Sequence, residues 1–312
     1  MALRTAPVTV QVPEGLRRPT RFASLARREA MLAYIFMLPG LLILLLFMAY
    51  PFVYGIWLSV TNKWVAVSDY EYVGLENFRW YLDDPIFIQS VKNTFIYAFG
   101  TVPFKLLLGL GLALLLNERF NFSRFMRAGL LLPWIVPTAI SSLAWLMLFD
   151  GVLSPISWIL KDWGLINSNI NFLGDAWNAR LSLCLANIWR GVPFFAVSIL
   201  AGLQAVSSEL HEAAALDGAN AWQRFRSVTL PVIKNIMLIT TLFSIIWTFA
   251  DFQLIYVLTK GGPANTTHVF GTYSYQIMGV GYIGEAAAIS LYMFPVLAFF
   301  AVILLWFVRK ED

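Results

Sequence analysis

Residues 32–58 read LAYIFMLPGLLILLLFMAYPFVYGIWL, a run in which no residue is charged. At a rise of about 1.5 Å per residue, a helix of this length spans a hydrocarbon core of about 30 Å. Further apolar runs occupy roughly 94–116, 128–149, 180–203, 232–257 and 286–308. A helix satisfies its own backbone hydrogen bonds in lipid, whereas a membrane barrel would require short alternating segments, which the sequence lacks. The sequence therefore predicts an all-α membrane protein with six transmembrane helices.

The composition agrees with a membrane protein and offers no chemistry of its own. Hydrophobic residues make up 59% of the chain and charged residues 13%, too few charges for a soluble surface. Cys184 is the single cysteine and the two histidines, His211 and His268, are far apart in the sequence, so we expect neither a disulfide nor a metal site. The sequence contains no nucleophile–base set and no GxxxxGK[ST] phosphate loop, so we expect no catalytic residues.

Lysine and arginine are distributed unequally between the two sides of the predicted membrane domain. The N-terminal tail, the loops 117–127 and 204–234 and the C-terminus hold fourteen of them, whereas the alternate segments hold six. Because basic residues concentrate on the cytosolic side, both termini should face the cytosol. We therefore expect residues 1–30 to be a basic cytosolic tail and residues 31–312 to form one membrane domain.

The cytosolic segment 204–231 reads QAVSSELHEAAALDGANAWQRFRSVTLP and is too long for a plain connector. Ser208 suits the N-cap of a first helix, and Gly218 suits the left-handed residue that follows its end. Asn220 suits the N-cap of a second short helix, with Gln223 placed to complete a capping box. The segment therefore predicts a helix–glycine–helix element.

The second helix of this segment should carry an apolar stripe made by Trp222, Phe225 and Val228. Pro231 should then mark the entry to the fifth span by pushing residue 230 out of helical conformation. On periodicity alone two interpretations stay open: a docking surface for another protein, or an amphipathic segment that lies flat on the lipid headgroups.

Several motifs shift that balance. In the loop they are Glu212, Ala213, Ala214, Asp217, Gly218, Ala219, Phe225, Leu230 and Pro231. Elsewhere they are Tyr72–Phe78 before Asp84-Pro85 and Asn93-Thr94, Leu132-Pro133-Trp134 with Trp145, Trp189–Phe194, and Leu258–Pro263. The loop closely resembles the EAA loop of ABC importer permeases. The whole set, which runs over most of the chain, is similar to the maltose- and glycerol-phosphate-type permease family, first-subunit branch.

The resemblance implies the type I ABC importer permease fold and a place in the bacterial inner membrane as a multi-pass subunit. Such a permease translocates a sugar or related polyol that a solute-binding protein delivers, and it pairs with a second, homologous permease. The resemblance also implies that the loop 204–231 inserts a coupling helix into one of two copies of an ATPase subunit. ATP and Mg²⁺ bind those subunits, so this chain should need no cofactor and should not itself be an enzyme.

Ionisable residues inside spans usually face a partner or a watery cavity, and this chain has Lys105, Arg190 and Asp251. The alternative is that each lies near an interface and extends its charge to water, which suits Lys105 and Asp251 better than Arg190. Polar and aromatic neighbours could bind sugar hydroxyls or stack on a ring. The candidate pathway residues are therefore Arg190, Asn187, Trp189, Asp251, Gln253, Tyr256 and Lys105. Lys105 departs from the family's pattern.

An ion-coupled secondary transporter is the competing function. Such carriers tend to keep acidic or histidine residues in the middle of the membrane. Asp251 is the only acidic residue within a predicted span, and it lies towards one end of that span. The sequence therefore favours the importer permease.

Overall fold

The computed structural model describes residues 20–118 and 122–309, and the regular structure of these ranges is helical apart from two isolated β-bridges. Residues 1–19, which make up most of the predicted basic tail, lie outside the described residues. The chain divides into two compact units, residues 1–55 and 56–312.

The described residues of the first unit, 20–55, are helical throughout. Helix α1 (Thr20–Leu44) continues through the π-helical turn η2 (Leu45–Ala49) into α2 (Tyr50–Ser59). The part that is long and apolar enough to cross a membrane is Glu29–Ser59, which agrees with the first predicted span. The helix begins earlier than that span, so residues 20–30 of the predicted tail are helical.

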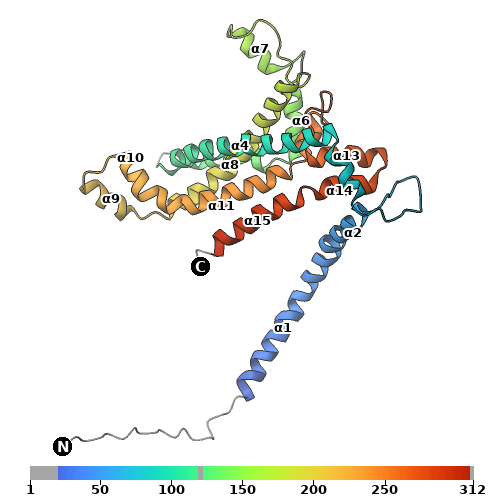
Figure 1. Cartoon of the computed structure of the whole chain (residues 1–312). Coiled ribbons are helices and arrows are strands. Elements are labelled where there is room, and N and C mark those ends of the chain that lie inside the picture. Colours follow the sequence, from blue (N-terminus) through green and yellow to red (C-terminus); the bar gives the residue numbers. More distant parts are fainter. Residues whose placement is uncertain (1–19, 119–121, 310–312) are drawn as a thin grey trace, which may run out of the picture. The chain divides into compact units, whose positions relative to one another are not determined.

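The second unit is built around four long helices: α4 (Pro85–Asn117), α8 (Ala176–Gln204), α11 (Leu230–Phe249) and α15 (Phe294–Arg309). Helix α4 packs on α8, α11 packs on both, and α15 packs on α11 (Figure 1). Their shared core is apolar and contains Ala98, Val102, Ala113, Leu116, Phe195, Ile199, Leu200, Ile233, Ile245 and Phe249.

Five helices of the described ranges are long and apolar enough to cross a membrane, or six if one bent pair counts as a span. That pair is α5 (Ser123–Ile135) and α6 (Thr138–Leu148), which meet at a bend of 92°. The third predicted span, 128–149, is therefore a broken one. Pro137 causes the break, because a proline disfavours helical conformation in the preceding residue, and Val136 is extended with φ −65° and ψ 129°.

The fifth predicted span, 232–257, is displaced along the chain. The continuous helical stretch runs over Ala221–Phe249, and its chain leaves helical conformation before the short helix α12 (Gln253–Leu258). Asp251 lies in this interruption. Its position at a helix break, rather than inside a helix, decides its contacts.

Residue 230 is helical, contrary to the prediction. Helix α10 (Ala221–Arg224) runs through the π-helical turn η3 (Phe225–Thr229) into α11, and Leu230 has φ −58° and ψ −41°. The N–H of Leu230 bonds to the carbonyl of Phe225, five residues back. This wider turn accommodates the ring of Pro231, whose missing N–H and bulk oppose an ordinary α-turn. The turn η2 stands in the same position before Pro51.

The remaining helices lie at the two ends of the bundle. Helices α9 (Ser208–Leu216) and α10 are at one end, whereas α13 (Phe270–Val280) and α14 (Ile283–Leu291) are at the other (Figure 1). Helix α3 (Glu76–Leu82) packs on α14, and Tyr81 donates a hydrogen bond to Glu285. The helix α7 (Pro155–Asp162) follows α6.

Candidate functional site

A buried ion pair joins α8 to the interruption after α11. Arg190 Nη2 lies 2.8 Å from Asp251 Oδ2, and the Asp251 side chain is 4% exposed. The same oxygen accepts hydrogen bonds from the hydroxyl of Tyr97 on α4 (2.9 Å) and the amide of Asn187 on α8 (3.0 Å). Arg190 also donates to Thr138 Oγ1 at the start of α6 (3.2 Å). Together these donors offset the cost of burying a carboxylate.

The local helix geometry explains why these groups meet. Asn187 and Arg190 are three residues apart on α8, so they lie on one helix face. Helix α11 ends at Phe249, so Asp251 lies in non-helical backbone, and its carboxylate contacts Arg190 on this face of α8. The pair therefore depends on a helix end and not on the regular spacing of an apolar run.

Lys105 lies in the same interior, with 3% of its surface exposed. Its Nζ donates to Thr248 Oγ1 at 3.0 Å, and the Thr248 hydroxyl donates in turn to the carbonyl of Ser244. Gly191 leaves room for the lysine stem, because a Cβ there would lie 2.7 Å from Lys105 Cδ and Cε. The alternative in which Lys105 and Asp251 extend to a membrane interface is therefore wrong, since both are enclosed within the protein.

A cavity of about 70 Å³ lies beside this lysine. Its lining combines charged or polar side chains with aromatic ones. Its lining residues are Lys105, Trp134, Asn187, Arg190, Gly191, Phe194, Ser244, Trp247 and Thr248. The cavity has room for a few water molecules or for a small polar group.

Three of the seven predicted pathway residues lie apart from this cluster. Trp189 is 40% exposed and packs edge-on against Trp145. Gln253 is exposed at the start of α12. Tyr256 stacks on Phe252, with ring centroids 5.0 Å apart. The structure thus brings together Lys105, Asn187, Arg190 and Asp251, and it places the other three elsewhere.

The sequence analysis missed Tyr97 and Thr248, which complete the buried cluster. A signal for Tyr97 was present, because Asn93, Tyr97, Thr101 and Lys105 recur at intervals of four within an apolar helix. Residues at this spacing share one helix face, and all four are buried. Thr248 carries a similar signal, because Thr240, Ser244 and Thr248 recur at intervals of four on α11 and all three are buried. Its contact with Lys105 depends on how α11 packs against α4.

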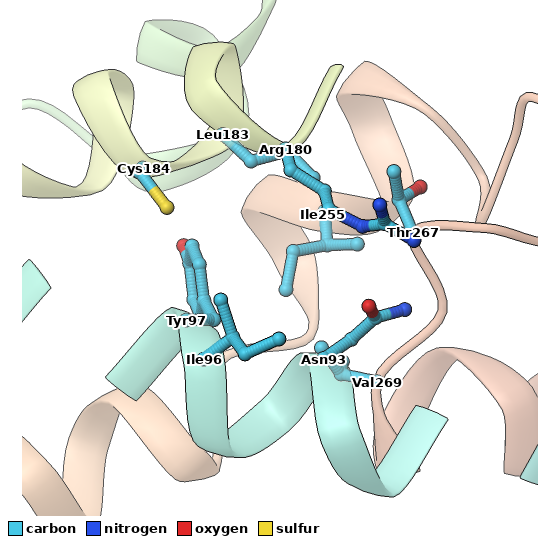
Figure 2. A pocket seen from close by; sticks show the side chains of 9 residues that line it. All are labelled: Asn93, Ile96, Tyr97, Arg180, Leu183, Cys184, Ile255, Thr267 and Val269. Atoms are coloured by element: carbon cyan, nitrogen blue, oxygen red, sulfur yellow. The ribbon is translucent and has the colours of Figure 1, made fainter. Parts of the chain in front are cut away.

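Tyr97 also borders a second, smaller cavity of about 20 Å³. Figure 2 shows the Tyr97 hydroxyl and the Cys184 sulfur facing one another across it, with Arg180 beside Thr267. Arg180 donates to the carbonyl of Thr266 at 3.0 Å. This cavity is therefore bordered by α4, α8, α12 and the loop that follows α12.

That loop is anchored by the side chain of Asn93, which donates to the carbonyls of Thr266 (2.7 Å) and His268 (2.9 Å). Burial lowers the pKa of His268 to about 4, so its imidazole stays neutral at physiological pH. Within the described ranges, no three His, Cys, Asp or Glu side chains gather as a metal site would require.

The predicted helix–glycine–helix element is present in the loop between α8 and α11. Helix α9 is capped by Ser207 rather than by Ser208, with the Ser207 hydroxyl accepting from the N–H of Glu209. Gly218 has φ +81°, the left-handed conformation that was expected. Asn220 and Gln223 form a complete capping box at the start of α10.

An open groove of about 1230 Å³ separates this element from the adjoining ends of α4 and α8. Neither α9 nor α10 buries a side chain, and Trp222 stacks on Phe225 at 5.6 Å. His211 Nε2 lies 3.5 Å from Thr229 Oγ1, which links α9 to η3. The element is thus held at its turn and caps, while both of its short helices remain accessible.

Comparison with known proteins places these features in a family. Residues 105–311 match the family described as binding-protein-dependent transport system inner membrane component. The chain is 34% identical over 283 residues to the trehalose/maltose transport system permease protein MalF of Thermococcus litoralis, a match that covers 91% of this chain and 95% of that protein. It is 31% identical over 289 residues to the sn-glycerol-3-phosphate transport system permease protein UgpA of Pectobacterium atrosepticum, covering 91% and 96%.

The fold is shared with a solved ABC transporter. A chain in the crystal structure of a bacterial alginate ABC transporter, in complex with an alginate pentasaccharide-bound periplasmic protein, superposes with a TM-score of 0.78. The two chains are 21% identical, and the match covers 91% of this chain and 96% of the other. At this identity the likeness concerns the fold.

Proposed function

The chain belongs to the family of binding-protein-dependent transport system inner membrane components, and on this premise we propose that it carries a sugar or related polyol through the membrane as one permease of an ABC importer. The relatives named above support this substrate class, since their names refer to trehalose or maltose and to glycerol phosphate. These relatives give no support to an ion-coupled secondary transporter.

We propose that the segment 204–231 couples this permease to an ATPase subunit. The observation that carries the proposal is the helix–glycine–helix element with two accessible short helices at one end of the bundle (Figure 1). The residues assigned to coupling are Glu212, Ala213, Ala214, Asp217, Gly218, Ala219, Phe225, Leu230 and Pro231. Because α10 runs without interruption through η3 into α11, a displacement of the docked element would be transmitted directly to a membrane helix.

The assembly that follows from this proposal has three kinds of partner. A second, homologous permease completes the pathway, two copies of an ATPase subunit bind ATP and Mg²⁺, and an external solute-binding protein delivers the substrate. This chain then contributes no catalytic residue and needs no cofactor of its own. Its termini and the coupling segment lie on the cytosolic side, consistent with the distribution of basic residues.

Gly218 provides the sharpest test of coupling. Its φ of +81° is unfavourable for side chains other than glycine and asparagine, yet a Cβ at this position would have no atom of this chain within 4 Å. Gly218→Val therefore strains the turn without overpacking it, at a cost of about 1–2 kcal/mol or more for a β-branched residue. Gly218→Asn is the matched control, because asparagine tolerates this conformation.

The experiment measures sugar uptake and ATP hydrolysis by the complex reconstituted in liposomes. We expect Gly218→Val to reduce uptake at least fivefold while the protein stays in the membrane, and Gly218→Asn to retain most of the uptake. Purification of the wild type should also recover an ATPase subunit. Normal uptake by the valine variant, or a permease that is active without an ATPase, would contradict the proposed function.

A further inference from the structure

The buried polar cluster carries one more positive than negative charge. In the described part of the chain, Asp251 is the carboxylate of this cluster, and it forms its salt bridge with Arg190 and not with Lys105. Arg190 and Asp251 neutralise one another at 2.8 Å. Among the described residues, Lys105 donates its hydrogen bond to a neutral hydroxyl, that of Thr248. The ammonium is therefore enclosed without a counter-charge of its own, an arrangement that is costly unless an anion joins it.

A second polar group of the same cavity, the amide oxygen of Asn187, has no hydrogen-bond donor among the described residues. Asn187 Oδ1 is buried and accepts no hydrogen bond from the described residues, while the Asn187 amide is used on Asp251. An amide oxygen is an acceptor and requires a donor such as a hydroxyl. Lys105 and Asn187 both line the cavity of about 70 Å³. The cavity thus offers a cation for an acidic group and an acceptor for a hydroxyl.

Aromatic side chains also line the cavity. Trp134 and Trp247 line it together with Phe194, whose ring centroid lies 6.1 Å from that of Trp134 and 4.9 Å from that of Trp247. Trp134 and Trp247 are both half exposed, so the aromatic side extends outward from the buried ammonium. Such faces pack against the apolar face of a sugar ring.

From these three features we infer that the cavity at Lys105 binds the acidic group of an anionic carbohydrate, such as a uronate, a sugar phosphate or a sugar sulfonate. The acidic group accepts hydrogen bonds from the ammonium, an adjacent hydroxyl donates to Asn187 Oδ1, and the ring rests on the aromatic side chains. At about 70 Å³ the cavity holds the acidic end alone. This inference rests on the proposed function and narrows its substrate class.

The test compares acidic and neutral sugars that differ in one group. The melting temperature (Tm) of the purified complex is measured in detergent with galacturonate or galactose, at constant ionic strength set by sodium chloride. A ligand that binds the folded state raises Tm in proportion to its affinity. We expect galacturonate to raise Tm in a concentration-dependent manner and galactose to leave it unchanged.

Variants then assign the effect to the lysine. Lys105→Met removes the charge, whereas Lys105→Gln removes the charge and retains a donor for Thr248. Both should weaken the apparent affinity for galacturonate at least tenfold, the size expected for a charge-assisted hydrogen bond. Lys92→Met is the control, because Lys92 is exposed on the same helix α4, and it should behave as the wild type.

Three results would overturn the inference: equal effects of galacturonate and galactose, an effect of sodium chloride as large as that of galacturonate, or full galacturonate binding by both Lys105 variants. The second of these would indicate a site for any small anion. The measurement uses neither ATP nor the binding protein, so its failure is distinguishable from a failure of the Gly218 experiment.

Discussion

Replacing Asp251 by asparagine tests whether the ion pair with Arg190 holds the second unit together. Asparagine keeps the size of the side chain but removes the charge that Tyr97, Asn187 and Arg190 approach at 2.8–3.0 Å. The variant leaves Lys105 buried and Arg190 partly buried, and it removes the carboxylate that pairs with Arg190. The loss is therefore expected to exceed that of a single neutral hydrogen bond.

The magnitude follows from the burial of the two partners. Breaking a buried ion pair costs about 3–5 kcal/mol when the remaining charge stays buried. The Asp251 side chain is 4% exposed but that of Arg190 is 22% exposed, so water can solvate part of the guanidinium. We therefore expect Asp251→Asn to lower the free energy of unfolding by about 3 kcal/mol, the lower end of this range, or roughly a hundredfold in the folded-to-unfolded ratio.

The assay is reversible unfolding of the permease in mixed micelles, with Arg190→Gln and the double variant completing a double-mutant cycle. The sum of the stability losses in the two single variants should exceed the loss in the double variant by at least about 1 kcal/mol, because the second substitution has no ion pair left to break. Asp83→Asn, at an exposed position after α3, is the control and should change stability little. A loss below about 1 kcal/mol for Asp251→Asn, or additive single losses, would refute the reasoning.

Two further predictions concern packing and pH. Gly109 on α4 lies so close to α8 that an added Cβ would overlap Phe195 and lie 3.1 Å from the backbone nitrogen of Ala196. Gly109→Ala should therefore destabilise the protein by about 1–3 kcal/mol in the same unfolding assay. The control is Gly111→Ala, which has no atom within 4 Å of its Cβ and should be neutral or stabilising. Equal effects of the two substitutions would contradict the close approach of α4 and α8 at Gly109. His268 has its pKa lowered by burial from 6.5 to about 4, so below pH 6.5 the unfolded state gains a proton that the folded state does not. The free energy of unfolding should consequently fall as pH drops from 6.5 to about 4, and His268→Gln should lack this decrease. An identical pH profile of Tm in the wild type and the variant would show that His268 does not cause the loss of stability.

The helical architecture and the helix–glycine–helix element were predictable because both depend on local sequence. Long apolar runs select helices in lipid whatever their neighbours are. Gly218 and the Asn220–Gln223 capping box likewise act within a few residues, and the structure has both as predicted. The errors were also local: the cap is Ser207 instead of Ser208, and a π-helical turn keeps Leu230 helical before Pro231.

The proline positions show where local reasoning gives an incomplete answer. Pro137 breaks the third span by a bend of 92°, whereas Pro103 and Pro193 lie inside continuous helices. All three lack the N–H that an internal turn requires. Helices α4 and α8, which contain Pro103 and Pro193, pack against each other, and this packing supports both helices. Whether a proline breaks a helix therefore depends on the neighbours around the carbonyl that loses its hydrogen bond.

The sequence by itself determined that the chain crosses a membrane with helices, and which segment forms the helix–glycine–helix element. Only the tertiary structure decided which of the ionisable residues meet. Lys105, Arg190 and Asp251 come from three separate helices or helix ends, and their pairing is set by how α4, α8 and α11 pack. Hydrophobicity and capping act over a few residues, whereas the energy of a buried charge depends on every group within several ångströms, wherever that group lies in the sequence.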